Sequence, residues 1–164
     1  MRSSRRPAVL ALLLLTGAAT ACIPADRPIP ETLAATDVSS GWYDVGVENG
    51  KNKLSPSITL TVKNISSTPV ASVQLNAVFR RVGETEEWGG AYVQLVGSDG
   101  LAPGASTKPV MLRSQLGYTS TEPRALMLKN SLFLDTRVWV FAKLGAQQWA
   151  KLGEWPITRE LILR

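Results

Sequence analysis

The sequence predicts an all-β fold, an antiparallel sandwich or barrel of about seven or eight strands. Apolar and polar residues alternate with a period of two in several short stretches, which is typical of half-buried strands. Clusters of Gly, Pro, Ser and Asn separate these stretches, and no long helical period is present. At 164 residues, the chain has the length of a single domain.

The clearest strand is predicted over 57–64. Ile58, Leu60 and Val62 fall on one face there, and polar side chains fall on the other. The first face is therefore expected to lie in the core. We expect the same pattern in 72–80, whose inward residues are Val73, Leu75, Ala77 and Phe79.

Further strands follow in the second half of the chain. Pro103 and Gly104 suit the two central positions of a type II turn, which separates two of these strands. The remaining predicted strands cover 91–97, 106–112, 132–144 and 147–157.

The N-terminus has the features of a secretory signal. A basic start precedes an apolar stretch, residues 8–21, and small residues follow. As a helix this stretch would span only about 21 Å, at 1.5 Å per residue, which is short for a hydrocarbon core of about 30 Å. Residues 1–21 are therefore predicted to be a cleaved signal peptide that directs export.

The only cysteine, Cys22, directly follows this segment. Ala19, Thr20, Ala21 and Cys22 resemble a bacterial lipobox, in which the cysteine is lipidated and becomes the new N-terminus after cleavage. The same three small residues also satisfy the rule for ordinary signal cleavage, which would release a soluble protein. Because no second cysteine is available for a disulfide, we favour lipidation of Cys22.

A lipid anchor would attach the protein durably to a membrane, since two or more acyl chains hold a protein stably. Residue 23 is Ile, not the Asp that retains many such lipoproteins at the inner membrane. In a bacterium with two membranes, the resemblance implies the outer membrane, facing the periplasm.

The segment after Cys22 is rich in proline and in small residues. Residues 22–40 are predicted to be a lipidated N-terminus followed by a disordered, extended tether. Residues 41–164 then form the folded domain.

The folded part resembles the small immunoglobulin-like domains of bacterial envelope proteins, including the FxLYD type. Such domains have a strand that ends in asparagine, a polar turn, a strand with an aromatic residue and a Pro-Gly turn. The resemblance implies an immunoglobulin-like antiparallel β-sandwich. The matching residues are Val62, Asn64, Val73, Leu75, Phe79, Pro103 and Gly104.

The composition argues against catalysis. The chain has no histidine, the commonest general base and zinc ligand, and its one thiol lies in the leader. No glycine-rich phosphate loop or Ser-x-x-Lys motif is present. We therefore expect no enzyme activity, cofactor or metal site.

The net charge of +5 does not predict a nucleic-acid partner. Three of the 18 basic residues, Arg2, Arg5 and Arg6, lie in the predicted signal peptide, and the remainder of the chain is nearly neutral.

Recognition is predicted at the hairpin 80–92, which has more charged and aromatic residues than a simple connection needs. Trp88 would be an exposed anchor inside a charged rim. The alternative is that Trp88 folds back over the sheet and the charges pair with each other. The rim consists of Arg80, Arg81, Glu84, Glu86 and Glu87.

These observations predict a lipid-anchored cell-envelope protein of binding or structural role. Its partner would be an envelope protein or a glycan. The alternative is a soluble periplasmic carbohydrate-binding or chaperone-like module.

Overall fold

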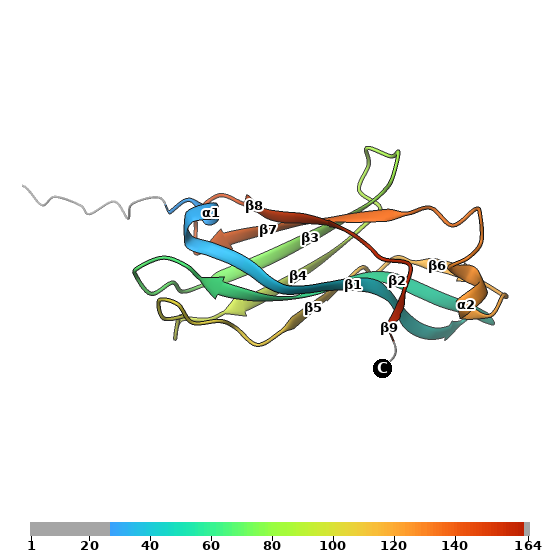
Figure 1. The fold of residues 1–164 in the computed structure, drawn as a ribbon, viewed down its shortest axis with the longest axis horizontal. Helices are drawn as coiled ribbons and strands as arrows, with labels where there is room; N and C mark the ends of the chain where they lie inside the picture. The colour runs from blue at the N-terminus through green and yellow to red at the C-terminus, as the bar shows by residue number, and fades with distance from the viewer. Residues whose placement is uncertain (1–26, 163–164) are drawn as a thin grey trace, which may run out of the picture.

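The computed structural model describes residues 27–162, which form two β-sheets packed face to face (Figure 1). The predicted all-β sandwich is therefore confirmed. The predicted signal peptide and Cys22 lie outside the described residues. Within 27–162 there are nine strands and two one-turn helices, namely α1 (Ile29–Thr32), β1 (Leu33–Glu48), β2 (Lys51–Asn64), β3 (Val73–Arg81), β4 (Gly89–Val96), β5 (Val110–Arg113), β6 (Tyr118–Ser120), α2 (Arg124–Met127), β7 (Thr136–Leu144), β8 (Ala150–Pro156) and β9 (Leu161–Ile162).

The strand order is immunoglobulin-like. The first sheet has the order β5-β2-β1-β9, with β6 also paired to β2, and the second has the order β4-β3-β7-β8. All pairs are antiparallel except β1 with β9. This arrangement corresponds to strands A, B and E packed against strands C′, C, F and G. Strands β6 and β9 have only three and two residues, and the other seven match the predicted number.

The core lies between the sheets, as the alternation predicted. Ile58, Leu60 and Val62 of β2 are fully buried, and so is Phe79 of β3. In β7, too, every second residue is buried, because alternate residues along a strand point to opposite faces. The other fully buried inward residues of β3 and β7 are Val73, Leu75, Ala77, Val138, Val140 and Ala142.

The tether predicted for residues 22–40 is wrong over the part that the structure describes. Ile29 and Leu33 are only 2% exposed, and β1 begins at Leu33. Pro28 is the N-cap of α1 and Pro30 lies in its first turn, where proline has the right φ and lacks only an unneeded N–H. The proline-rich composition therefore starts a helix, and the domain boundary moves from residue 41 to about residue 29.

Asn64 ends β2 and organises the turn that leads to β3. Its side chain is completely buried, and its amide donates to the carbonyls of Thr68 and Leu101, both at 2.9 Å. Its Oδ1 accepts from the backbone N–H of Ser66 at 3.0 Å. All the polar atoms of this buried amide thus have partners.

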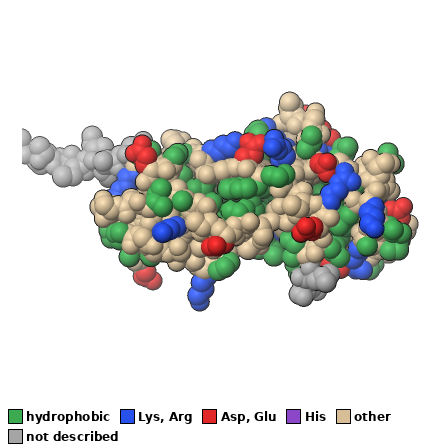
Figure 2. Space-filling view, in the orientation of Figure 1, with side chains coloured by type: hydrophobic (Ala, Val, Ile, Leu, Met, Phe, Trp, Pro, Cys, Tyr) green, Lys and Arg blue, Asp and Glu red, His purple; other side chains and the backbone are tan. Residues whose placement is uncertain are grey.

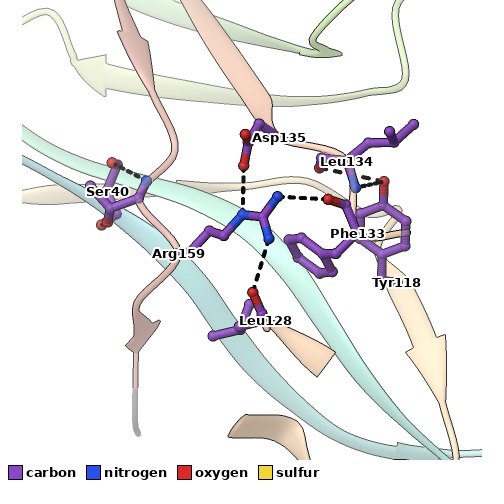
Figure 3. Close-up of polar contacts among 8 residues, drawn as sticks. Ser40, Tyr118, Leu128, Phe133, Leu134, Asp135 and Arg159 are labelled. Carbon is purple, nitrogen blue, oxygen red and sulfur yellow. Dashed lines mark hydrogen bonds and ion pairs between the residues drawn. The ribbon is translucent and has the colours of Figure 1, made fainter. Parts of the chain in front are cut away.

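Arg159 fixes the opposite end of the sandwich (Figure 3). Its Nε donates to Asp135 at 2.7 Å, and its Nη atoms donate to the carbonyls of Phe133 at 2.8 Å and Leu128 at 3.2 Å. The backbone N–H of Thr158 donates to the hydroxyl of Ser40. The bonds of Arg159 hold the segment between α2 and β7 against the C-terminal segment, and the bond of Thr158 ties the C-terminal segment to β1.

No helix within residues 27–162 combines the length and the apolar character needed to span a bilayer.

The burial pattern predicts which substitutions unfold the sandwich. We expect Leu60→Ala and Phe79→Ala to lower the free energy of unfolding by about 2 to 5 kcal/mol, because each leaves a cavity. The matched outward substitutions Thr59→Ala and Gln74→Ala should cost less than about 0.5 kcal/mol. Chemical denaturation of the four variants measures this. Equal losses in both sets would contradict the assignment of strand faces.

The N-terminal boundary predicts the effect of truncation. A chain that begins at Val38 lacks the buried Ile29 and Leu33, each of which contributes about 1.5 to 3 kcal/mol. We therefore expect it to be less stable than a chain that begins at Arg27 by roughly 3 to 6 kcal/mol. Urea unfolding compares the two, and equal midpoints would show that α1 is dispensable.

Candidate functional site

The hairpin between β3 and β4 protrudes from the sandwich at the top of Figure 1. Glu84, Glu86 and Glu87 are exposed on it, as the sequence predicted for a charged rim. Arg81 forms an ion pair with Glu84, with an N–O distance of 3.4 Å. The other two carboxylates have no ion-pair partner within residues 27–162.

Trp88 is half-buried and packs inward from the base of this hairpin. Its ring centroid lies 5.1 Å from that of Tyr118 and 6.2 Å from that of Trp42, which is fully buried. Phe133 completes this cluster at 4.4 Å from both Trp42 and Tyr118. The position of Trp88 therefore matches the alternative in which it covers the end of the core.

Arg80 and Arg81 point to opposite faces of the second sheet, because they are consecutive in β3. The guanidinium of Arg81 lies 4.5 Å from the centre of the Trp88 ring, at the end of the core. The guanidinium of Arg80 lies 3.9 Å from the centre of the Trp139 ring, on the outer face. The two arginines predicted to lie in one charged rim therefore lie on different faces of the second sheet. Only Arg80 lies on its outer face.

The outer face of the second sheet gathers basic and aromatic side chains from its four strands and from the loop before β8. Pairing places Arg80 beside Arg137, Trp139 beside Glu154, and Phe141 beside Lys151. In Figure 2, basic side chains flank an acidic one along the upper edge, next to the hairpin. We define the basic-aromatic face as Arg80, Tyr92, Arg137, Trp139, Phe141, Lys143, Trp149, Lys151 and Glu154.

The charges on this face do not cancel. Glu154 is its one carboxylate, and it pairs with Lys151 at 2.6 Å and with Arg137 at 3.2 Å. The hydrogen bond from Lys151, followed by one from Trp139, lowers the pKa of Glu154 below its ordinary value. This carboxylate therefore stays ionised to a lower pH than a free glutamate.

Two cations on the face have no ion-pair partner among the described residues. Arg80 stacks on Trp139, and the ammonium of Lys143 lies 5.1 Å from the centre of the Trp149 ring. Such contacts orient a cation over an aromatic ring without neutralising its charge. Both charges remain available to an anion.

A hollow of about 310 Å³ lies at the base of the hairpin, next to Arg80. Arg80, Arg81 and Arg137 line it together with Trp139, Glu154 and residues 82–85, which include Glu84. The Nε atom of Arg80 is buried and has no hydrogen-bond partner within the described part of the chain. The three guanidinium groups that line the hollow outnumber its two carboxylates, Glu84 and Glu154, which favours a ligand with an acceptor oxygen.

The other end of the face presents aromatic rings to solvent. Tyr92 is 60% exposed and Trp149 is 39% exposed. Their ring centroids lie 6.3 Å apart, with an interplanar angle of 79°. The hydroxyl of Tyr92 donates to the side chain of Gln74, which fixes the ring at the sheet edge.

The prediction from sequence did not include the β7 part of this face. The signal was nevertheless present, because Val138, Val140 and Ala142 are inward and the residues between them must point outward. Trp149 lies in the loop before β8, where its position beside a polar turn predicts exposure but not its place on this face.

Metal ligation has no basis in the described residues, where no three His, Cys, Asp or Glu side chains gather closely enough to hold an ion.

Comparison with known proteins adds little. No protein-family model matches the chain, and no curated protein matches it. Among solved structures, the chain is similar to the X-ray structure of Northeast Structural Genomics Consortium target SoR45. The identity is 9% and the TM-score is 0.43, over 79% of this chain and 88% of that chain.

The inward packing of Trp88 predicts a loss of stability on truncation. We expect Trp88→Ala to lower the free energy of unfolding by about 2 kcal/mol, less than for a fully buried tryptophan. The control Glu86→Gln, on the exposed part of the same hairpin, should change it by less than about 0.5 kcal/mol. Thermal melting compares the two, and an unchanged melting temperature for Trp88→Ala would place its ring in solvent.

Proposed function

We propose that this chain is an exported protein of the bacterial cell envelope, anchored by lipid on Cys22, whose immunoglobulin-like sandwich is a non-enzymatic binding module. In a bacterium with two membranes it resides at the outer membrane and faces the periplasm. The export and anchoring parts of the proposal rest on the sequence of residues 1–22.

The binding part of the proposal rests on one observation. The basic-aromatic face has four cations, one carboxylate and two exposed aromatic rings on an open sheet. Neither the core nor the strand pairing requires these outward residues, because the inward positions already bury the apolar surface. Exposed aromatic and basic residues on a rigid scaffold are typical of recognition surfaces.

A second candidate is a soluble periplasmic carbohydrate-binding module, released by ordinary cleavage before Cys22. The exposed rings of Tyr92 and Trp149 favour carbohydrate, because such rings offer an apolar face with a polar end. The two candidates differ in the anchor and not in the sandwich.

Metabolic labelling with a clickable fatty acid tests the anchor. We expect the full-length protein to take up the label and to fractionate with membranes, because the lipobox cysteine receives acyl chains. Cys22→Ala should lose both properties. Equal labelling of the two proteins, or none in either, would remove the anchor and leave the soluble alternative.

Photocrosslinking in intact cells tests the binding role. A photoreactive residue at Trp149, on the basic-aromatic face, should form crosslinks to an envelope component. The control position is Met111, which is 43% exposed on the other sheet. Identical crosslinks from both positions, or none from Trp149, would contradict a binding role for this face.

A further inference from the structure

We propose that the basic-aromatic face binds an extended acidic glycan. Its anionic groups pair with Arg80 and Lys143, and its sugar rings lie against Tyr92 and Trp149. This inference rests on the proposed binding function and names the chemical class of the partner.

The charge of the face determines the charge of the ligand. Arg137 and Lys151 share Glu154, whereas Arg80 and Lys143 have no carboxylate partner among the described residues. An anion therefore meets two cations whose charge nothing on the face has neutralised. The planar fork of Arg80 suits an anionic group with two oxygens, which a carboxylate and a phosphate both provide.

The hollow beside Arg80 gives this anion a defined position. Arg80, Arg81 and Arg137 line it with Glu84 and Glu154, so cations outnumber carboxylates there, and the hairpin residues 82–85 form part of its lining. An acidic group in the hollow accepts hydrogen bonds from the guanidinium of Arg80, which lies over the Trp139 ring.

The spacing along β7 indicates an extended ligand. Arg137, beside Arg80, and Lys143 are six residues apart, which is about 20 Å along a strand. A single small anion engages only one end of this row. A chain with repeated acidic groups engages both ends and crosses the aromatic residues between them.

The exposed rings distinguish a glycan from other polyanions. Tyr92 and Trp149 meet at an angle of 79° and expose apolar ring surface close to Lys143. Sugar rings have apolar C–H faces that pack on aromatic rings, whereas a chain of phosphates alone has none. The combination of free cations and exposed rings therefore favours an acidic glycan.

Calorimetric titration of the full-length protein tests the proposal with polygalacturonate and with a phosphate-bearing mannan. The comparison ligands are methyl-esterified polygalacturonate, dextran, inorganic polyphosphate and anionic lipid vesicles. We expect at least one acidic glycan to bind, and the esterified and neutral glycans to bind at least tenfold more weakly. Added salt should weaken the binding, because it screens exposed charges.

Variants test the residues. We expect Arg80→Gln, Lys143→Gln and Trp149→Ala each to weaken the binding about tenfold, which corresponds to about 1.4 kcal/mol. The control Lys63→Gln removes one exposed positive charge from β2, in the other sheet, and should leave the affinity unchanged. Melting temperatures of all four variants establish that they are folded.

Three results would overturn the proposal. The first is that neither acidic glycan binds. The second is that polyphosphate or anionic vesicles bind as tightly as the glycans while Trp149→Ala has no effect. The third is that Lys63→Gln weakens the binding as much as Arg80→Gln. Crosslinks to an envelope protein from position 149 in any of these cases would preserve the binding function and reject only the glycan.

Discussion

The packing of the inward residues of β2 against those of β3 and β7 is the constraint on which the rest of the structure depends. Leu60, Phe79 and Val140 belong to one fully buried cluster between the sheets. Because side chains alternate along a strand, each inward residue sets the direction of its neighbours. Trp139 must point outward once Val138 and Val140 point inward. The core therefore determines the pattern of the outer surface.

The sequence predicts those parts of the fold in which the period of two is unbroken. The prediction succeeds for β2 and β3 and misses β1, the longest strand. Its pairing with β2 is interrupted between Thr36 and Ser39 and again between Asp44 and Gly46. Each irregularity adds one residue to β1 relative to β2, which reverses the faces to which later residues point. The apolar residues of β1 therefore do not follow one period of two along the sequence.

The candidate site was harder to predict than the fold, because nearness in the sequence is a poor guide to nearness on a sheet. Arg80 and Arg81 are neighbours in the chain, yet one lies on the outer face and the other at the end of the core. Arg80 and Arg137 are far apart in the chain and directly opposite each other in the sheet. Strand order and register supply this information, and composition does not.

If Cys22 is lipidated as proposed, the early start of α1 limits how far the sandwich can move from the membrane. Only six residues separate Cys22 from Ile29, a contour of about 25 Å at most. Helix α1 lies at one end of the long axis, and α2 and β6 lie at the other (Figure 1). A lipid on Cys22 would therefore keep the α1 end next to the bilayer while the far end reaches outward. The sandwich would therefore contact only envelope material that lies close to the membrane in which it is anchored.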